Sequence, residues 1–222
     1  MSLVLNIDTS LETASVSIAM NGKILHATTN TVQKNHAAFL HPGIKHVLHL
    51  AGKHITEIDA VAVTSGPGSY TGIRVGMSCA KGLCMALIKP FITINTLELL
   101  AKDALIYNMQ ADTLYCPMID ARRMEVYTAL YDQSFNMVLK PCAMIIDKNF
   151  FSEYIQYNPV MFFGNGSIKL KDFASIQNYC IIENVNIPSS LALLSFELFS
   201  NKSFTDLIYS EPTYVKDFYT GT

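Results

Sequence analysis

Two aspartates occupy matching positions in the chain, and each directly follows a short apolar run. Asp8 follows Leu3–Ile7, and Asp120 follows Leu114–Ile119. A carboxylate at the end of a buried strand can help to hold magnesium and nucleotide phosphates, but glycines are then needed in the next turn so that backbone N–H groups can approach the phosphate oxygens. Neither turn has a glycine, because the next residues are Thr9-Ser10-Leu11-Glu12 and Ala121-Arg122-Arg123. The sequence therefore disfavours a self-sufficient ATP site, and the alternative is that each carboxylate binds the backbone of its own turn.

A glycine-rich segment opens a helix in the first half of the chain. The stretch Gly66–Gly72 can present backbone N–H groups to an anion, or it is a tight turn whose glycines let helix and sheet approach closely. In the following helix, Gly72, Gly76 and Ala80 form a ladder of small side chains four residues apart. This helix is apolar almost all round, so it must be buried on more than one side. One side meets its own sheet, and the other meets the first helix or a partner subunit.

The histidines and cysteines do not predict a metal site. All six histidines lie in the first 54 residues, but His36 and His41 are five apart, about 140° round a helix, and cannot share one ion from one face. His46 and His49 share a face without a carboxylate nearby in the sequence, which favours a solvated helix surface. The five scattered cysteines are expected to be buried free thiols in a reducing cytoplasm; they are Cys79, Cys84, Cys116, Cys142 and Cys180.

Composition bounds the class of protein. The chain has 222 residues, of which 50% are hydrophobic and 15% charged, and this excludes an intrinsically disordered protein. The net charge of −2 gives no strong field for nucleic acid or for an anionic membrane. No apolar run approaches the roughly 20 residues of a membrane span, and the start reaches Asp8 too early for a secretory leader. We expect a cytoplasmic protein without a membrane partner.

The elements that must position these residues follow from hydrophobic periodicity. In the first half we expect strands at 3–7, 14–20, 23–29, 60–64 and 91–94, and helices at 35–53 and 71–87. Asn95 and Glu98 predict the capped start of a third helix. In the helix at 35–53, an apolar arc includes Leu40, Ile44, Val47 and Leu48. Pro42 must lie in its first turn or kink it, because proline cannot donate to an interior carbonyl.

The second half repeats the pattern of the first. Strands are expected at 114–119, 125–131, 137–140 and 160–163, and Gly164–Ser167 matches the glycine turn at Gly66–Ser69. Two landmarks in the same order predict a duplicated α/β lobe with mixed sheets flanked by helices. We place an N-terminal lobe at 1–106 and a smaller, degenerate C-terminal lobe at 107–222. The segment 167–210 has no clear periodicity.

Four stretches carry a family resemblance. They are Asn6–Ser10, the helix start from His36 to Pro42, Ser65-Gly66-Pro67-Gly68-Ser69-Tyr70-Thr71-Gly72-Ile73-Arg74-Val75-Gly76, and Ile119-Asp120-Ala121-Arg122-Arg123-Met124-Glu125-Val126-Tyr127. Together they strongly resemble the bacterial TsaB (YeaZ) family, from the first strand to about Tyr131. Glu211–Lys216 looks like the closing segment of the family, with lysine where arginine is usual, and the likeness is loose between Phe150 and Ser210.

The resemblance implies an actin-like fold (ASKHA, RNase H-like) of two lobes and a role in making N6-threonylcarbamoyladenosine in tRNA. TsaB-like proteins are similar in fold to the catalytic subunit TsaD but lack its metal-binding His-x-x-x-His. They act as its dimerisation partner, and the ATPase TsaE joins the complex. The resemblance further implies a homodimer when the chain is alone and tRNA contacts only within the complex. It allows ATP or ADP at a composite interface, with no intrinsic cofactor.

We therefore expect a non-catalytic scaffold subunit with no metal site and no catalytic residue. The resemblance places the partner surface on the first two helices, and the residues expected there are Leu40, Ile44, Val47, Leu48, Gly72, Arg74, Gly76, Ala80 and Leu83. The residues of a vestigial nucleotide site are Asp8, Thr9, Ser10 and Asp120. The alternative function is an independent actin-like ATPase or small-molecule kinase that uses Asp8 and Asp120. A metallopeptidase is a more distant alternative.

Overall fold

The chain separates into two compact units. The computed structural model describes residues 1–32, 35–107, 110–147, 149–172, 179–182 and 187–216. Unit 1 comprises Met1–Leu99 and Asn186–Thr213, and unit 2 comprises Leu100–Val185 and Tyr214–Thr222. This division differs from the single boundary expected at 106/107, because a late segment of the chain returns to the first unit.

Unit 1 is built on a five-stranded sheet. In sheet order its strands are β3 (Lys23–Asn30), β2 (Ala14–Met20), β1 (Leu3–Asp8), β4 (Ala60–Gly66) and β5 (Phe91–Asn95). Strands β1 to β3 are antiparallel neighbours, whereas β4 and β5 run parallel to β1. Asn21 and Gly22 adopt the positive φ angles of the tight turn that this pair predicts. All five expected strands are confirmed, with ends that differ by at most two residues.

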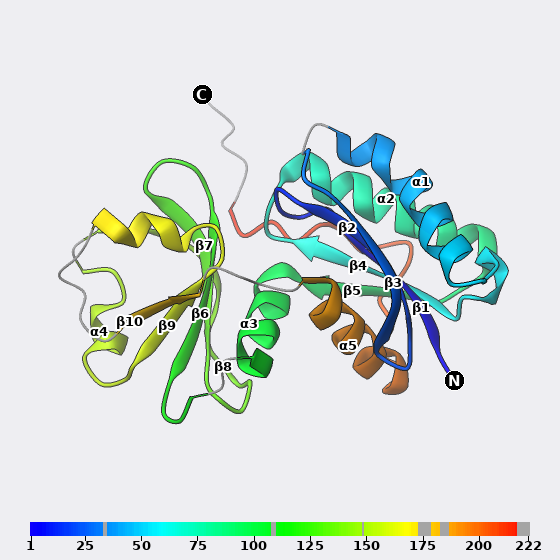
Figure 1. Ribbon diagram of the computed structural model, residues 1–222. Helices are drawn as coiled ribbons and strands as arrows, with labels where there is room; N and C mark the ends of the chain where they lie inside the picture. The colour runs from blue at the N-terminus through cyan, green and yellow to red at the C-terminus, as the bar shows by residue number, and fades with distance from the viewer. Residues whose placement is uncertain (33–34, 108–109, 148, 173–178, 183–186, 217–222) are drawn as a thin grey trace. The chain divides into compact units, whose positions relative to one another are not determined.

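Helices cover both faces of this sheet (Figure 1). α1 (His36–Leu50) and α2 (Tyr70–Leu87) lie on one face, and α5 (Ile187–Ser200) lies on the other. The 3-10 turn η2 (Ile55–Glu57) precedes β4. α3 (Thr96–Tyr107) follows β5, and Asn95 caps it because its Oδ1 accepts a hydrogen bond from the N–H of Leu97 at 2.9 Å. No helix among the described residues is long and apolar enough to cross a membrane.

Strand β1 is buried on both sides, as its apolar run predicts. Leu3, Leu5 and Ile7 pack in the core that includes the buried residues of α1 and α2. Val4 points to the opposite core, where it packs with Leu191 of α5. The short strand that ends at Asp8 is therefore held by a hydrophobic core on each face of the sheet.

Pro42 lies inside α1 rather than in its first turn. The bond that proline cannot form would have gone to the carbonyl of Ala38. Ala38 is exposed, so water can satisfy that carbonyl and the helix continues.

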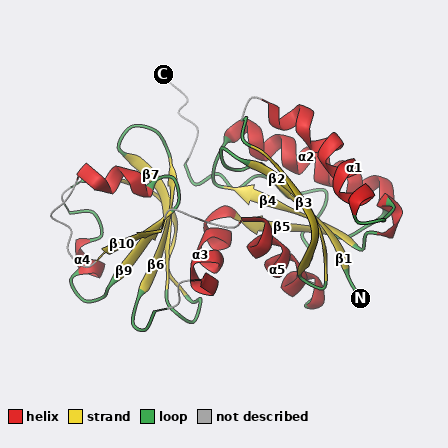
Figure 2. Ribbon diagram, viewed as in Figure 1, coloured by secondary structure: helices red, strands yellow, loops and turns green. Residues whose placement is uncertain are grey.

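Unit 2 repeats the topology of unit 1 (Figure 2). In sheet order its strands are β10 (Tyr179–Ile182), β9 (Val160–Phe163), β6 (Leu114–Asp120), β7 (Glu125–Tyr131) and β8 (Met137–Ile145), and the short elements α4 (Ser152–Ile155) and η3 (Ser167–Asp172) accompany the sheet. The order β8-β7-β6-β9-β10 mirrors β3-β2-β1-β4-β5, so the predicted duplication is confirmed. β8 extends beyond the expected end at Lys140, because β7 offers it pairing partners as far as Glu125.

The segment after α5 runs back along unit 1. Its hydrogen bonds to unit 1 include Thr205 N to Phe91 O at 2.8 Å, Lys81 Nζ to Ser210 O at 2.5 Å, and Thr213 N to Ser65 O at 2.7 Å. The expected family closing segment therefore begins against the carboxyl end of β4.

Candidate functional site

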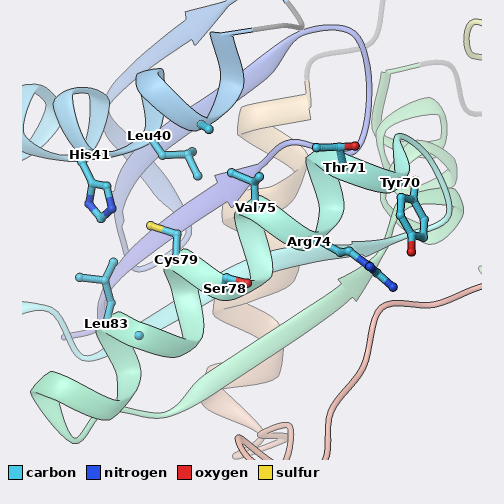
Figure 3. A pocket seen from close by; sticks show the side chains of 11 residues that line it. Leu40, His41, Tyr70, Thr71, Arg74, Val75, Ser78, Cys79 and Leu83 are labelled. Carbon is cyan, nitrogen blue, oxygen red and sulfur yellow. The ribbon is translucent and has the colours of Figure 1, made fainter.

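An open groove lies between α1 and α2, with a volume of about 770 Å³ (Figure 3). Its lining residues are Ala37, Leu40 and His41 from α1 and Tyr70, Thr71, Arg74, Val75, Ser78, Cys79, Gly82 and Leu83 from α2. Val75, Cys79 and Leu83 point toward α1. Near the beginning of α2, the Arg74 guanidinium lies over the Tyr70 ring, 4.1 Å from its centroid. The groove thus combines largely apolar walls with a cationic group at one end.

The structure corrects the position of most residues expected on the partner surface. Seven of the nine are buried in unit 1: Leu40, Ile44, Val47, Leu48, Gly72, Gly76 and Ala80. The apolar arc of α1 packs against β2 and β3 of the chain's own sheet, so it is not presented to a partner. Arg74 and Leu83 do lie in the groove, and Leu40 reaches its wall although the side chain is buried.

The ladder of small residues on α2 faces the turn after β1. A Cβ atom at Gly72 would overlap the carbonyl oxygen of Thr9, and one at Gly76 would overlap the Thr9 hydroxyl. That hydroxyl donates a hydrogen bond to the Gly72 carbonyl at 2.7 Å. The ladder therefore serves the close approach of α2 to its own sheet, which is the intramolecular alternative that the sequence left open.

Apart from Arg74, the exposed residues of the groove lie outside the predicted surface. Thr71, Ser78 and Gly82 are exposed, and Val75 and Cys79 are half-buried. The ladder of small residues on α2 could have identified these residues from the sequence. Small side chains allow a close approach to the sheet, so the ladder marks the side of α2 that faces the sheet. The opposite side of α2 must then face α1 and solvent. Burial raises the pKa of the Cys79 thiol, which keeps it protonated at neutral pH.

Asp8 is buried and bound by its own chain. Its Oδ1 accepts hydrogen bonds from the Ser10 N–H at 2.9 Å, the Ser10 hydroxyl at 2.6 Å and the Thr64 hydroxyl at 2.6 Å. The Ser10 carbonyl in turn accepts from the Ser69 N–H at 2.7 Å, so the turn packs directly on the start of α2. The Ser10 N–H, a backbone donor of this turn, points inward to Asp8. One oxygen of the Asp8 carboxylate is thus engaged by three donors of its own chain.

Asp120 is exposed and bound by a lysine. Its Oδ1 accepts from the Lys169 ammonium at 2.6 Å and from the Arg122 N–H at 2.6 Å. Partial burial raises the pKa of Asp120, but the Lys169 ammonium and the Arg122 N–H outweigh that effect and hold the pKa below its usual range. Both aspartates thus bind their own turns, as the alternative predicted, although they lie in different units.

Histidines and cysteines in the described residues form no metal cluster. No three His, Cys, Asp or Glu side chains there gather in a way that could hold an ion. The His36 Nε2 lies 3.1 Å from the Glu12 carbonyl, whereas His41 lines the groove. The four described cysteines are free, and burial raises the pKa of Cys84 to about 11. Cys180 lies outside the described side chains.

A family comparison agrees with this architecture. The model of the TsaD family, described as tRNA N6-adenosine threonylcarbamoyltransferase, matches residues 24–195, from β3 into α5. The chain belongs to this family. TsaD is also the catalytic subunit that the sequence resemblance named as the structural relative of TsaB.

Curated relatives of the chain include several TsaB proteins. The tRNA threonylcarbamoyladenosine biosynthesis protein TsaB of Bacillus subtilis (strain 168) is 33% identical over 128 residues, which cover 58% of this chain and 54% of that protein. TsaB of Escherichia coli (strain K12) is 34% identical over 133 residues, which cover 60% and 56%. The chain spans about half the length of these curated relatives.

A solved structure of the same group matches over nearly the whole chain. YeaZ from Pseudomonas aeruginosa gives a TM-score of 0.75 at 25% identity, covering 96% of this chain and 100% of that chain. Together with the TsaB relatives, it confirms the TsaB (YeaZ) resemblance and the actin-like α/β fold of two lobes.

Proposed function

We propose that the chain is a non-catalytic scaffold subunit in the synthesis of N6-threonylcarbamoyladenosine in tRNA. The pathway is supported by the family match and by relatives that are named for this biosynthesis. In this proposal a TsaD-like partner performs threonylcarbamoyl transfer, a TsaE-like ATPase joins the complex, and tRNA is bound by the assembly. The chain works in the cytoplasm, where this tRNA chemistry takes place.

The observation that carries the scaffold role is the groove between α1 and α2. Apolar walls that remain open on a helix pair are typical of a surface that another helix covers. Val75, Cys79 and Leu83 offer this surface, while Ser78 and Gly82 leave room for a close approach. A TsaD-like partner uses the groove in the complex, and a second copy of the chain uses it when the chain is alone.

The non-catalytic role is supported by the hydrogen bonds of the turn after β1. The Asp8 carboxylate is engaged by hydroxyl and N–H groups of its own chain, and the turn packs on the start of α2. An independent ATPase or kinase would need these groups to face nucleotide phosphates. In this proposal ATP or ADP binds at a composite interface to which the partners contribute the phosphate ligands.

A matched pair of tryptophan variants tests the groove. Ser78→Trp fills the groove from an exposed position, and Ala86→Trp places the same side chain at an exposed position of α2 outside the lining. We expect Ser78→Trp to weaken binding of the purified TsaD-like partner at least about tenfold by isothermal titration. Ala86→Trp should bind as the wild type does. Equal affinities for both variants would contradict the proposed surface.

Depletion of the chain tests the pathway. Mass spectrometry of tRNA nucleosides should then show loss of N6-threonylcarbamoyladenosine, which returns when the wild-type chain is re-expressed. The Ser78→Trp variant should restore less of the base than Ala86→Trp does. Persistence of the base after complete depletion would contradict the pathway.

A further inference from the structure

Two adjacent arginines form the tip of the β6–β7 hairpin in unit 2. The chain has thirteen lysines but only three arginines, which are Arg74, Arg122 and Arg123. Arg122 and Arg123 are both exposed, and neither side chain forms an ion pair or a ring contact within the part of the chain that the structure describes. A chain that otherwise uses lysine thus places most of its guanidinium groups at one exposed turn.

Both arginines adopt backbone conformations that favour glycine. Their φ angles are +68° for Arg122 and +47° for Arg123. A side chain with a Cβ atom is strained in this left-handed region, where glycine and asparagine are at ease. Such outliers persist where the surrounding structure enforces them, and they concentrate at binding and catalytic sites.

The surrounding hydrogen bonds hold the tip in this conformation. The Arg122 N–H donates to the Asp120 carboxylate at 2.6 Å, and the Glu125 N–H donates to the Arg122 carbonyl at 3.1 Å. The Ala121 N–H closes the turn on the Glu125 carbonyl at 3.1 Å. The two guanidinium groups are therefore displayed from a fixed turn rather than from a loose loop.

The carboxylates beside the tip are already neutralised by lysines. Asp120 pairs with Lys169 at 2.6 Å, and Glu125 pairs with Lys216 at 2.7 Å. Each pair cancels one negative charge, so the charges of Arg122 and Arg123 are left over. The tip presents about two net positive charges to solvent although the whole chain is slightly acidic.

We propose that Arg122 and Arg123 bind phosphate groups of an RNA backbone. Guanidinium is planar and pairs with phosphate through two parallel hydrogen bonds, which lysine cannot do. An exposed hairpin tip suits the extended phosphodiester chain of an RNA, whereas a free nucleotide is usually enclosed in a cavity. The identity of the RNA as tRNA rests on the proposed function; the phosphate site itself rests on the two arginines.

Arginine-specific modification tests the site with an internal reference. The full-length chain reacts with phenylglyoxal at low salt, and mass spectrometry follows Arg74, Arg122 and Arg123 separately. We expect bulk tRNA to slow modification of Arg122 and Arg123 at least about threefold and to leave Arg74 unchanged. ATP and inorganic phosphate, at the same total phosphate concentration, should not protect the tip. No protection by tRNA, or equal protection by ATP, would overturn the RNA assignment.

Glycine variants separate binding from folding. Arg122→Gly and Arg123→Gly each remove a charge and relieve the backbone, so we expect a melting temperature about 2–4 °C higher and tRNA binding about tenfold weaker. The slope of log affinity against log salt should fall by about 1. Lys202→Gly is the matched control, because Lys202 is also exposed and basic with a φ of +54°. It should melt higher while binding tRNA as the wild type does.

The outcomes distinguish this site from the proposed function. If depletion leaves the modified base in tRNA but the arginines are still protected, the RNA site stands and the pathway falls. If the base is lost but Arg122→Gly binds tRNA like Lys202→Gly, the pathway stands and the RNA site falls.

Discussion

The turns after β1 and β6 occupy the same position in two units of identical strand order. In both, the aspartate accepts a hydrogen bond from the N–H two residues further on, but the side chains that bind the aspartates differ. Asp8 and the first two residues of the turn after β1, Thr9 and Ser10, are buried, and hydroxyl groups of Ser10 and Thr64 bind the aspartate. The turn after β6 is exposed, and Lys169 binds its aspartate. The repeated topology thus determines the position of each carboxylate in its sheet. The neighbouring side chains determine whether the carboxylate is buried or exposed to solvent.

The difference arises from the element that comes after the next parallel strand in each unit. After β4, the long helix α2 brings Gly72 and Gly76 against Thr9 and covers the turn. After β9, the short turn η3 follows Gly164 and Gly166, which approach β6, and Lys169 reaches Asp120 from there. At this point unit 1 is closely packed, whereas Asp120 of unit 2 is exposed.

The largest effect on stability should come from adding one methyl group where α2 packs on the turn after β1. Gly72→Ala places a Cβ atom on the Thr9 carbonyl, and we expect a loss of about 3 kcal/mol in the free energy of unfolding. Gly82→Ala is the control on the same helix, because nothing lies within 4 Å of its added Cβ; it should gain about 0.5–1 kcal/mol. Urea titration measures both. Equal effects would mean that α2 does not approach the turn closely.

Replacing Asp8 and Asp120 by alanine compares how much each carboxylate contributes to the stability of the fold. Asp8→Ala leaves the buried hydroxyls of Ser10 and Thr64 without their acceptor, so we expect a loss of about 3 kcal/mol. Asp120→Ala breaks an exposed pair and should lose less than about 1 kcal/mol. The comparison would fail if urea titration gave the larger loss for Asp120→Ala.

Lowering the pH should isolate the contribution of the Asp120–Lys169 ion pair to stability. The folded-state pKa of Asp120 is lowered, so its contribution to stability is present above the unfolded value of about 3.9 and is lost as the pH falls through the folded pKa. Chemical unfolding of wild type and Asp120→Asn from pH 7 to pH 3 measures this contribution. The two stabilities should converge, by less than about 1 kcal/mol, toward the acid end. A constant difference would show that the charge of Asp120 contributes nothing.

No saturable binding is expected when the isolated chain is titrated with Mg-ATP. The Ser10 N–H and the Thr64 hydroxyl are turned toward Asp8 rather than toward a ligand. Isothermal titration of wild type and Asp8→Ala should therefore give the same heats of dilution. Micromolar binding that is lost in Asp8→Ala would reopen the ATPase or kinase alternative.

The sequence was sufficient to predict most strands of the two sheets and the duplication, because the signals for these are local. Apolar runs ending in Asp8 and Asp120, together with the paired glycine turns, indicated the duplicated sheets that the structure contains. The late helix α5 was not expected, because its sequence is apolar on nearly every side and gives little helical periodicity. Its partner face is defined by β1 and β5, which lie far away in the chain.

The site was harder to derive because periodicity shows that a helix face is buried and does not show what covers it. The arc with Leu40 and Ile44 in α1 was assigned to a partner, but the chain's own sheet covers it. On α2, the position of the glycine ladder would have told the two sides apart, since Gly72 and Gly76 admit a backbone turn rather than a bulky helix. The exposed wall with Ser78 and Gly82 can be identified only when that turn is known.

The return of α5 to unit 1 has a consequence for how the protein is made. On the ribosome, β1, β4 and β5 emerge first, but the helix that covers one face of their sheet is translated only after the whole of β6 to β10. Until then Val4, Ala62 and Ile92 lack the cover that Leu191 and Leu194 provide. Unit 1 therefore cannot bury this face of its sheet until the strands of unit 2 have been synthesised. A nascent chain stalled before Ile187 would expose an apolar sheet surface of the kind that chaperones bind.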